Sequence, residues 1–249
     1  MGNLVKTGIE GLDIMLDGGL PAGSTTLVSG KIGTGKTIFA MQFMVSGARD
    51  HDEPGVFVTV DERPEDLRRA MLNFGWDLAS LEKEGKLAIV DVASLVAELP
   101  SKEEYKVTGE LSVDNVVSAI IDVANSIGAK RLVLDSIPAL GMQMDLPSLR
   151  KVLHRLVQLL INLECTSLLT TEIDEATKNI SKYRVEEFLT RGVIILDLIE
   201  DKRGVATRTV KIRKMREVDH DLNKRPIKIT SEGIVVYQSE KLFGEEEGF

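Results

Sequence analysis

The stretch GKIGTGKT, residues 30–37, decides how this chain of 249 residues is interpreted. It satisfies the pattern Gly-x4-Gly-Lys-Thr, whose glycines let a loop curl until successive backbone N–H groups face inward. Those groups and the N-terminus of the following helix bind phosphate oxygens. We therefore expect a phosphate loop with these binding residues: Gly30, Lys31, Ile32, Gly33, Thr34, Gly35, Lys36 and Thr37.

Two side chains of the phosphate loop have separate expected roles. The Lys36 ammonium would lie on the β- and γ-phosphates, and the Thr37 hydroxyl is placed to ligate magnesium. The motif requires a strand before it and a helix after it. Residues 24–29 (STTLVS) have strand character, and residues 36–48 carry apolar side chains at helical spacing. The expected ligands are therefore ATP and Mg²⁺.

Apolar segments of strand length alternate with helical periods on both sides of this loop. Strands are expected at 55–61, 86–92, 131–135, 166–171 and 192–198, and helices from residue 64, at 112–127 and at 146–163. This alternation predicts an α/β fold, a P-loop NTPase with a mostly parallel central sheet and helices on both faces. Residues 206–215 and two short strands within 227–237 predict antiparallel additions at the C-terminal edge.

Local signals and composition set the expected limits of the fold. Ser112 is a helix cap and Gly128 a helix stop. The polar segment 99–110 is expected to be a mobile surface loop. We expect one domain over residues 1–243, followed by an acidic, disordered tail at 244–249 (GEEEGF).

The composition excludes several classes of protein. The formal net charge of −8 argues against a protein that coats nucleic acid or an anionic membrane by bulk charge. With one cysteine, Cys165, the chain forms no internal disulfide, which is typical of a reducing compartment. Neither a signal peptide nor an uncharged apolar stretch of membrane-spanning length is found, so a cytoplasmic location is expected.

Three carboxylates are expected at the sheet edge that carries the phosphate loop. Asp135 ends an apolar strand, a place from which an acid typically holds the magnesium ion. Asp61 and Glu62 end another strand, where open α/β sheets bind their ligands. A carboxylate there can activate the water that attacks the γ-phosphate. The sequence leaves open which of the two is the base, and an exposed acidic turn before Pro64 is the simpler alternative.

Several stretches outside the phosphate loop match one family. They are TGIEGLD at 7–13, GGLPAGS at 18–24, VFVTVDERPEDL at 56–67, FGWDL at 74–78, EGKL at 84–87, TTE at 170–172, EFL at 187–189, GVIIL at 192–196 and KMR at 214–216. In these stretches, which cover nearly the whole chain, the sequence resembles the KaiC-like branch of the RecA superfamily of ATPases. The resemblance implies a RecA-like core that assembles head to tail as a hexameric ring, with ATP between subunits.

The same resemblance implies roles for two further groups of residues. Lys214 and Arg216 match a Lys-x-Arg pair that reaches the γ-phosphate of the neighbouring subunit, and both would face the same way on a strand. A basic exposed strand edge, which discourages aggregation, is the alternative. Residues 170–172 match a strand end that senses the γ-phosphate.

The chain departs from the family pattern in two ways. Asp61 stands where the family usually has the first of two glutamates. Its shorter side chain places the carboxylate about one C–C bond farther from the attacking water. Catalysis is sensitive to errors near 1 Å in such a position. Hydrolysis is therefore expected to be slow. The two-domain clock member of the family has two phosphate loops and this chain has one, so a clock function is not carried over.

Four functions remain to be compared. The first is a ring ATPase that acts on a protein partner, and the second is an accessory protein that binds single-stranded DNA through its pore. The loop 174–184 favours the second, because it holds Lys178, Lys182, Tyr183 and Arg184. The third is an assembly switch that binds ATP with little turnover. The fourth, a small-molecule kinase, would need an arginine-bearing lid, and the segment 99–110 contains no arginine.

Overall fold

The computed structural model describes residues 3–138, 145–173, 179–200 and 204–238. Within these ranges, nine strands form one sheet in the order β11-β10-β9-β8-β3-β7-β6-β4-β5, and β1 pairs with β2 in a small second sheet. The strands are β1 (Leu4–Val5), β2 (Leu20–Pro21), β3 (Thr25–Gly30), β4 (Gly55–Thr59), β5 (Leu87–Asp91), β6 (Arg131–Asp135), β7 (Thr166–Glu172), β8 (Gly192–Glu200), β9 (Ala206–Met215), β10 (Arg225–Thr230) and β11 (Gly233–Val236).

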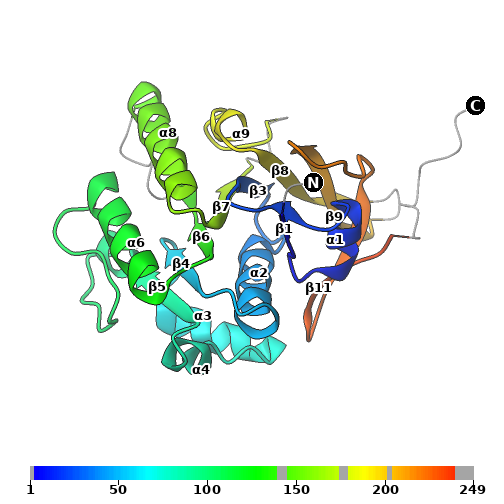
Figure 1. Ribbon diagram of the computed structural model, residues 1–249. Coiled ribbons are helices and arrows are strands. Elements are labelled where there is room, and N and C mark those ends of the chain that lie inside the picture. Colours follow the sequence, from blue (N-terminus) through cyan, green and yellow to red (C-terminus); the bar gives the residue numbers. More distant parts are fainter. Residues whose placement is uncertain (1–2, 139–144, 174–178, 201–203, 239–249) are drawn as a thin grey trace, which may run out of the picture.

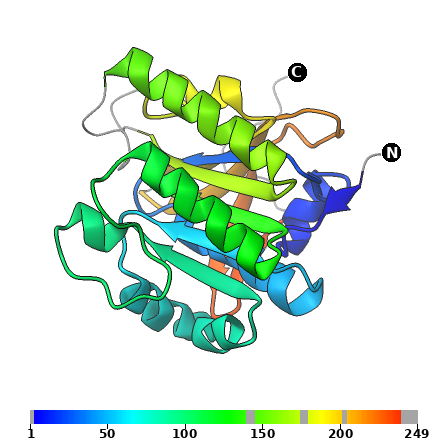
Figure 2. The ribbon, with the colours of Figure 1, turned by 60° about the vertical axis from the view of Figure 1, so that its left-hand side comes forward.

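Helices cover both faces of the large sheet (Figure 1). They are α1 (Glu10–Met15), α2 (Lys36–Asp50), α3 (Pro64–Met71), α4 (Leu78–Lys83), α5 (Ala93–Val96), α6 (Val113–Ile127), α8 (Leu146–Asn162) and α9 (Glu186–Leu189), with a 3-10 turn at Leu72–Phe74. The long helices α6 and α8 lie side by side over one face (Figure 2). None of the helices in the described ranges is long and apolar enough to cross a bilayer.

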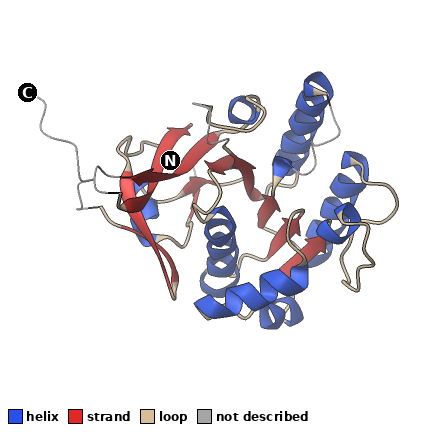
Figure 3. Ribbon diagram, turned by 180° about the vertical axis from the view of Figure 1, so that it is seen from behind, coloured by secondary structure: helices blue, strands red, loops and turns tan. Residues whose placement is uncertain are grey.

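The strand directions confirm the predicted fold class. The six strands from β8 to β5 in the sheet order run parallel to their neighbours. β9, β10 and β11 continue the sheet antiparallel at one end (Figure 3). Mostly parallel strands need crossover helices, and these put helices on both faces.

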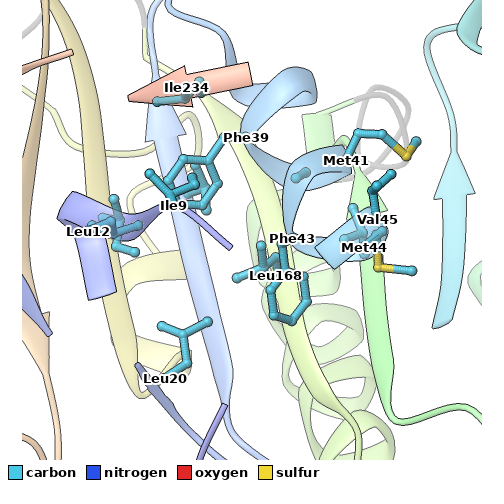
Figure 4. Close-up of a cluster of buried hydrophobic side chains, with 14 of the residues drawn as sticks. Ile9, Leu12, Leu20, Phe39, Met41, Phe43, Met44, Val45, Leu168 and Ile234 are labelled. Atoms are coloured by element: carbon cyan, nitrogen blue, oxygen red, sulfur yellow. The ribbon is translucent and has the colours of Figure 1, made fainter. Parts of the chain in front are cut away.

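Two hydrophobic cores lie on opposite faces of the sheet because successive strand residues point to opposite sides. On β3, Leu27 joins the core under α6 and α8, and Val28 joins the core under α1, α2, α3 and α4. Figure 4 shows the second of these cores, to which Phe39 and Phe43 of α2 belong together with Ile9, Leu12 and Leu168. The predicted apolar stripe of α2 is thus its buried side.

The limits of α6 follow from the residues predicted to set them. The Ser112 side chain accepts a hydrogen bond from the Asn115 N–H at 3.1 Å, which caps the helix. Gly128 ends it in the left-handed conformation, with φ of 62°. Glycine adopts this conformation without the strain that a Cβ brings.

A buried arginine ties α2 to the start of β6. The Arg131 side chain is 1% exposed, pairs with Glu53 at 2.6 Å between Nη2 and Oε2, and lies 4.4 Å from the centre of the Phe43 ring. The guanidinium lies beside Gly47 near the C-terminal end of α2, where an added Cβ would come within 2.4 Å of Arg131 Nε. The glycine therefore makes room for the arginine, although glycine weakens a helix interior by about 1 kcal/mol relative to alanine.

The segment 99–110 lies at the surface, as the sequence predicted, and its backbone pairs with an edge strand; its mobility stays a prediction. It follows the outer edge of β5, where the Asp91 N–H donates to the Tyr105 carbonyl at 3.0 Å and the Val107 N–H donates to the Asp91 carbonyl at 3.1 Å. Glu103 accepts two hydrogen bonds from Arg68 of α3. Most of its side chains are exposed, while Val107 is buried in the core and the backbone covers the end of an edge strand at Asp91.

Candidate nucleotide site

Four parallel strands end around one cleft. The register pairs Gly30 of β3 with Glu172 of β7, and Thr59 of β4 with Asp135 of β6, so these carboxyl ends lie at the same edge of the sheet. A cleft of about 440 Å³ opens there. Its lining residues are Ile32, Gly33, Gly35, Lys36, Thr37, Ile38, Asp61, Glu62, Asp135, Ser136, Pro138 and Glu172. The sheet thus brings together most of the predicted site residues.

The phosphate loop is held in its curled form by close backbone contacts. A Cβ on Gly30 would lie 2.6 Å from Thr34 Oγ1 and 2.7 Å from the Leu196 carbonyl, so only glycine fits there. The Lys36 Nζ donates to the carbonyls of Gly30 at 2.9 Å and Lys31 at 3.1 Å. α2 begins at Lys36, so its N-terminus, which carries partial positive charge, points toward the loop.

Lys36 carries its charge in a partly buried place. Burial lowers the pKa of Lys36, and the nearby carboxylates of Glu172, Asp135 and Asp61 oppose that shift. A partly desolvated ammonium interacts more strongly with an anion than an exposed one does. This part of the cleft is therefore suited to phosphate.

Asp135 is held by two hydroxyl groups. Thr37 Oγ1 donates to Asp135 Oδ2 at 2.7 Å, and Thr170 Oγ1 donates to Asp135 Oδ1. Burial raises the pKa of Asp135, and the two hydroxyl donors partly offset this effect. The hydroxyl of Thr37 and the carboxylate of Asp135 are hard oxygen ligands of the kind that Mg²⁺ takes.

A magnesium ion at this place would need ligands from outside the chain. No group of three or more histidine, cysteine, aspartate or glutamate side chains able to hold a metal occurs in the described ranges. Mg²⁺ is commonly bound through one or two protein oxygens together with waters and substrate phosphates. Thr37 and Asp135 fit that pattern, and zinc-type coordination does not.

The two acids after β4 lie in different surroundings. Asp61 accepts a hydrogen bond from the hydroxyl of Ser136, a residue that the sequence analysis did not single out although it directly follows Asp135. Glu62 also lines the cleft, and the described residues donate no hydrogen bond to its carboxylate in this structure. Burial raises the pKa of Glu62, and the charges of Asp135 and Asp66 raise it further. Of these two acids, Glu62 is thus the one whose carboxylate receives no hydrogen bond from the described residues.

Lys214 and Arg216 are not brought to this cleft. Met215 of β9 pairs with Gly192 of β8, and Gly192 pairs with Thr26 of β3, four residues before Gly30. Four strand residues span about 13 Å. Lys214 and Arg216 therefore lie toward the side of the sheet where the parallel strands begin, opposite the side that carries the cleft. Arg216, directly after β9, is exposed.

The Lys214 side chain is held by the backbone around α9. Its Nζ donates to the carbonyls of Glu187 at 2.7 Å and Thr190 at 2.6 Å. Burial lowers the pKa of Lys214, and the nearby Arg216 lowers it further. The two cations therefore lie close to each other at that edge.

The basic loop is less suited to stacking on bases than its sequence suggested. Residues 174–178, including Lys178, lie outside the described ranges, and so does the tail at 244–249. Lys182 and Arg184 are exposed. Tyr183, however, is partly buried, and its hydroxyl donates to the Pro138 carbonyl at 3.0 Å. The aromatic ring is thus engaged with the same chain.

Two contacts on the far side of the phosphate loop could not be predicted from the sequence. Lys31 pairs with Asp197 of β8 at 3.5 Å, and Arg208 of β9 donates from Nε to the Gly33 carbonyl at 3.0 Å. Their partners on the strands, Asp197 and Arg208, belong to no motif. The antiparallel pairing of β8 with β9 brings them to the loop, and no local pattern in the sequence predicts that pairing register.

Comparisons with known proteins agree on one family. A family model described as "ATPase: KaiC" matches residues 5–241. The UPF0273 protein MJ1359 of Methanocaldococcus jannaschii is 36% identical over 239 residues, which cover 96% of this chain and 98% of that one. The circadian clock oscillator protein KaiC of Synechococcus elongatus is 40% identical over 235 residues, which cover 94% of this chain. The match covers 44% of that clock protein, so the chain spans less than half of its length.

A solved structure shows the same fold. The crystal structure of the KaiC-like protein PH0186 from Pyrococcus horikoshii matches with a TM-score of 0.83 at 44% sequence identity. The match covers 95% of this chain and 100% of that one. The resemblance stated from short sequence stretches is therefore confirmed over nearly the whole chain.

Proposed function

Because this chain belongs to the KaiC family of ATPases, we propose that it hydrolyses ATP with Mg²⁺ as a head-to-tail ring. Each ATP would lie between two subunits. The observation that carries this proposal is the cleft in which Lys36, Thr37 and Asp135 face Asp61 and Glu62. It combines the groups that bind phosphate and magnesium with carboxylates that can act on water.

The proposal gives each cleft residue a part in phosphoryl transfer. The backbone N–H groups of the phosphate loop and the Lys36 ammonium bind the β- and γ-phosphates. Thr37 and Asp135 would hold Mg²⁺, which neutralises charge on the phosphate oxygens. Glu62 is the proposed general base because its carboxylate is free of hydrogen bonds from the described residues and its pKa is raised. Asp61, fixed by Ser136, would orient the attacking water.

The ring completes the site with residues from the neighbouring subunit. Lys214 and Arg216 lie too far from the cleft of their own chain to act there, and a head-to-tail contact would present them to the cleft of the next. An arginine supplied in this way stabilises charge in the transition state and is worth roughly 10³ to 10⁵ in rate. A six-membered ring is the proposed assembly.

The first test measures phosphate release by purified protein. We expect Lys36→Ala to abolish ATP binding, and Glu62→Gln to leave binding intact while it lowers kcat by about 10² to 10⁴. Equal and negligible rates for the wild type and Glu62→Gln would contradict an ATPase. A wild-type chain that binds no ATP in calorimetry would remove the proposal altogether.

The second test measures size with and without ATP and Mg²⁺. We expect ATP to convert the wild type to a ring, and Arg216→Ala to lose most of its hydrolysis rate. Arg213→Ala is the matched control, since Arg213 is also an exposed arginine but lies where β8 and β9 change register, between the pairs Val193–Lys214 and Ile194–Ile212. A monomer under all conditions would remove the neighbouring arginine from the mechanism.

An assembly switch with little turnover is the second candidate. The hydrogen bond between Ser136 and Asp61 favours it, because it draws one of the two acids away from the attacking water. In that case ATP would change the assembly while phosphate release stayed negligible.

The alternative function, binding of single-stranded DNA, is tested by a binding assay at low salt. Absence of binding under that condition would exclude it.

A further inference from the structure

One connecting segment, residues 180–191, joins the nucleotide cleft to the edge that carries Lys214 and Arg216. It includes α9 and one buried carboxylate, Glu186, which is 1% exposed. No lysine or arginine of the described ranges pairs with Glu186; four donors satisfy it instead through five hydrogen bonds. They are Thr171 Oγ1 at 3.0 Å, Ser181 Oγ at 2.8 Å, and the N–H groups of Tyr183 and Val185 at 3.2 and 3.1 Å, with Tyr183 reaching both oxygens.

The first end of the connecting segment is fastened around the cleft at three points. Ser29, the residue before Gly30, donates to the Ile180 carbonyl. The Tyr183 hydroxyl donates to the carbonyl of Pro138, which lines the cleft. Thr171, which donates to Glu186, stands between Thr170 on Asp135 and Glu172 in the cleft.

The other end of the connecting segment holds the cationic pair. Glu187 and Thr190 supply the two carbonyls that fix the Lys214 ammonium. The Arg191 carbonyl accepts from the backbone N–H of Arg216 at 3.2 Å. The residues whose carbonyls hold Lys214 and Arg216 thus begin one position after Glu186.

We propose that Glu186 is a positioning residue that couples a subunit's own nucleotide cleft to the Lys214–Arg216 pair that it offers to its neighbour. The inference rests on the proposed function, because it requires that pair to act on the next subunit. A shift of Thr171 or Pro138 on nucleotide binding would move Glu186, and with it the carbonyls that hold Lys214. Occupancy of one cleft would then change the rate in the next.

The chemistry of Glu186 supports a coupling role over simple packing. A buried carboxylate without a counter-ion is costly, and well-packed apolar residues are often as stable or more stable at such places. Its donors come from both the cleft strand β7 and the connecting segment itself, so the carboxylate is the point at which the two are joined. A leucine could fill the space, but it could not transmit a displacement through directed hydrogen bonds.

A double-mutant cycle on the assembled protein tests the coupling. We expect Glu186→Gln to lower the rate of hydrolysis about tenfold and the Hill coefficient for ATP to about 1, with ATP affinity changed less than about twofold. We expect Arg216→Ala to lower the rate about 10³-fold or more. The double variant should then be no slower than Arg216→Ala alone, since Glu186 acts through Arg216.

The outcomes separate the two proposals. If the losses multiply in the double variant, Glu186 has only a structural role and the coupling is wrong, while the proposed function stands. If Arg216→Ala alone leaves hydrolysis unchanged, the neighbour-supplied arginine of the proposed function is wrong, and the coupling falls with it.

A second, milder variant covers the case in which Glu186→Gln does not fold. Tyr183→Phe removes the hydroxyl that bonds to Pro138 and leaves the ring in place. It should lower the Hill coefficient toward 1 with a loss in rate of about threefold, and it should add nothing in the Arg216→Ala background. Tyr237→Phe removes a hydroxyl far along the chain, on the residue after β11, and serves as the matched control. An unchanged Hill coefficient in Tyr183→Phe would overturn the coupling.

Discussion

The two ends of β6 both carry a charge withdrawn from water, and they compensate it in different ways. Arg131 at the first end is paired with Glu53 inside the same chain. Asp135 at the second end opens on the cleft, and its hydrogen bonds from the described residues come from the uncharged hydroxyls of Thr37 and Thr170. Arg131, whose charge is compensated by Glu53, thus has a structural role. Asp135 has the Lys36 ammonium nearby but accepts its hydrogen bonds from hydroxyl groups, which leaves it able to bind a ligand that brings positive charge, as Mg²⁺ would.

The largest effect is expected from removing the charge at the cleft end. Asp135→Asn keeps the shape of the side chain and an oxygen that can accept from the hydroxyls, but it loses the charge that would hold Mg²⁺. We expect kcat/KM for ATP to fall about 10³-fold, which is roughly 4 kcal/mol of transition-state stabilisation. Phosphate release at several Mg²⁺ concentrations measures this, and a variant with wild-type rates would show that the carboxylate does not serve the metal.

The next effect is expected at the other end of the strand. Arg131→Met removes the guanidinium and leaves Glu53 without its partner, so we expect the free energy of unfolding to fall by about 3 kcal/mol. Arg155→Met is the matched control, because Arg155 pairs with Asp114 on the surface and such pairs contribute less than about 1 kcal/mol. Urea unfolding of both variants makes the comparison. Equal losses would mean that the buried pair is no more important than a surface pair.

A smaller effect is expected from the hydroxyl groups that orient Asp135. Thr170→Val keeps the size of the side chain and removes the donor to Asp135 Oδ1. Loss of a group that orients a metal ligand typically costs about 10- to 100-fold in metal affinity or activity. We therefore expect the Mg²⁺ concentration for half-maximal hydrolysis to rise about tenfold. Ser167→Val, on the same strand but away from the cleft, is a control that should leave the Mg²⁺ dependence unchanged.

The smallest expected effect is a gain in the stability of the Asp135→Asn variant. Burial raises the pKa of Asp135, so the folded state binds this proton more tightly than the unfolded state does. The carboxyl group therefore contributes stability that is present in acid and is lost as the pH rises through the raised pKa. Asparagine does not titrate, and stabilising changes at functional sites are commonly worth about 1 kcal/mol, or roughly 2–4 °C in Tm for a chain of this size.

Thermal unfolding without nucleotide, at a series of pH values, tests the sign of that gain. The advantage of Asp135→Asn over the wild type should grow from acid toward neutral pH. A variant that is less stable than the wild type at every pH would show that the hydroxyl contacts to the carboxylate outweigh its burial.

The sequence was sufficient to predict features that are set by residues close together along the chain, as two elements show. The limits of α6 follow from Ser112 and Gly128, and the strand at 131–135 follows from its apolar run and its terminal acid. The phosphate loop and the acids at strand ends could be predicted to meet, because carboxyl ends of parallel strands share one edge. These are local signals combined with one rule of topology.

Contacts between distant residues were beyond that reasoning. Ser136 donates to Asp61 across 75 positions, and Arg131 pairs with Glu53 across 78. Helix α9, with four residues, is too short for a helical period to identify. The hydrogen bonds that Glu186 receives depend on how the chain turns between β7 and β8, which no periodic pattern encodes.

The fit between Gly47 and Arg131 has a consequence for how this chain can vary. Because a methyl group at position 47 would overlap the guanidinium at position 131, neither site can change alone without loss. An alanine at 47, favourable in most helices, becomes acceptable only in a sequence that has also given up the arginine for a shorter side chain. Covariation of these two positions among relatives, 84 residues apart along the chain, should therefore be strong.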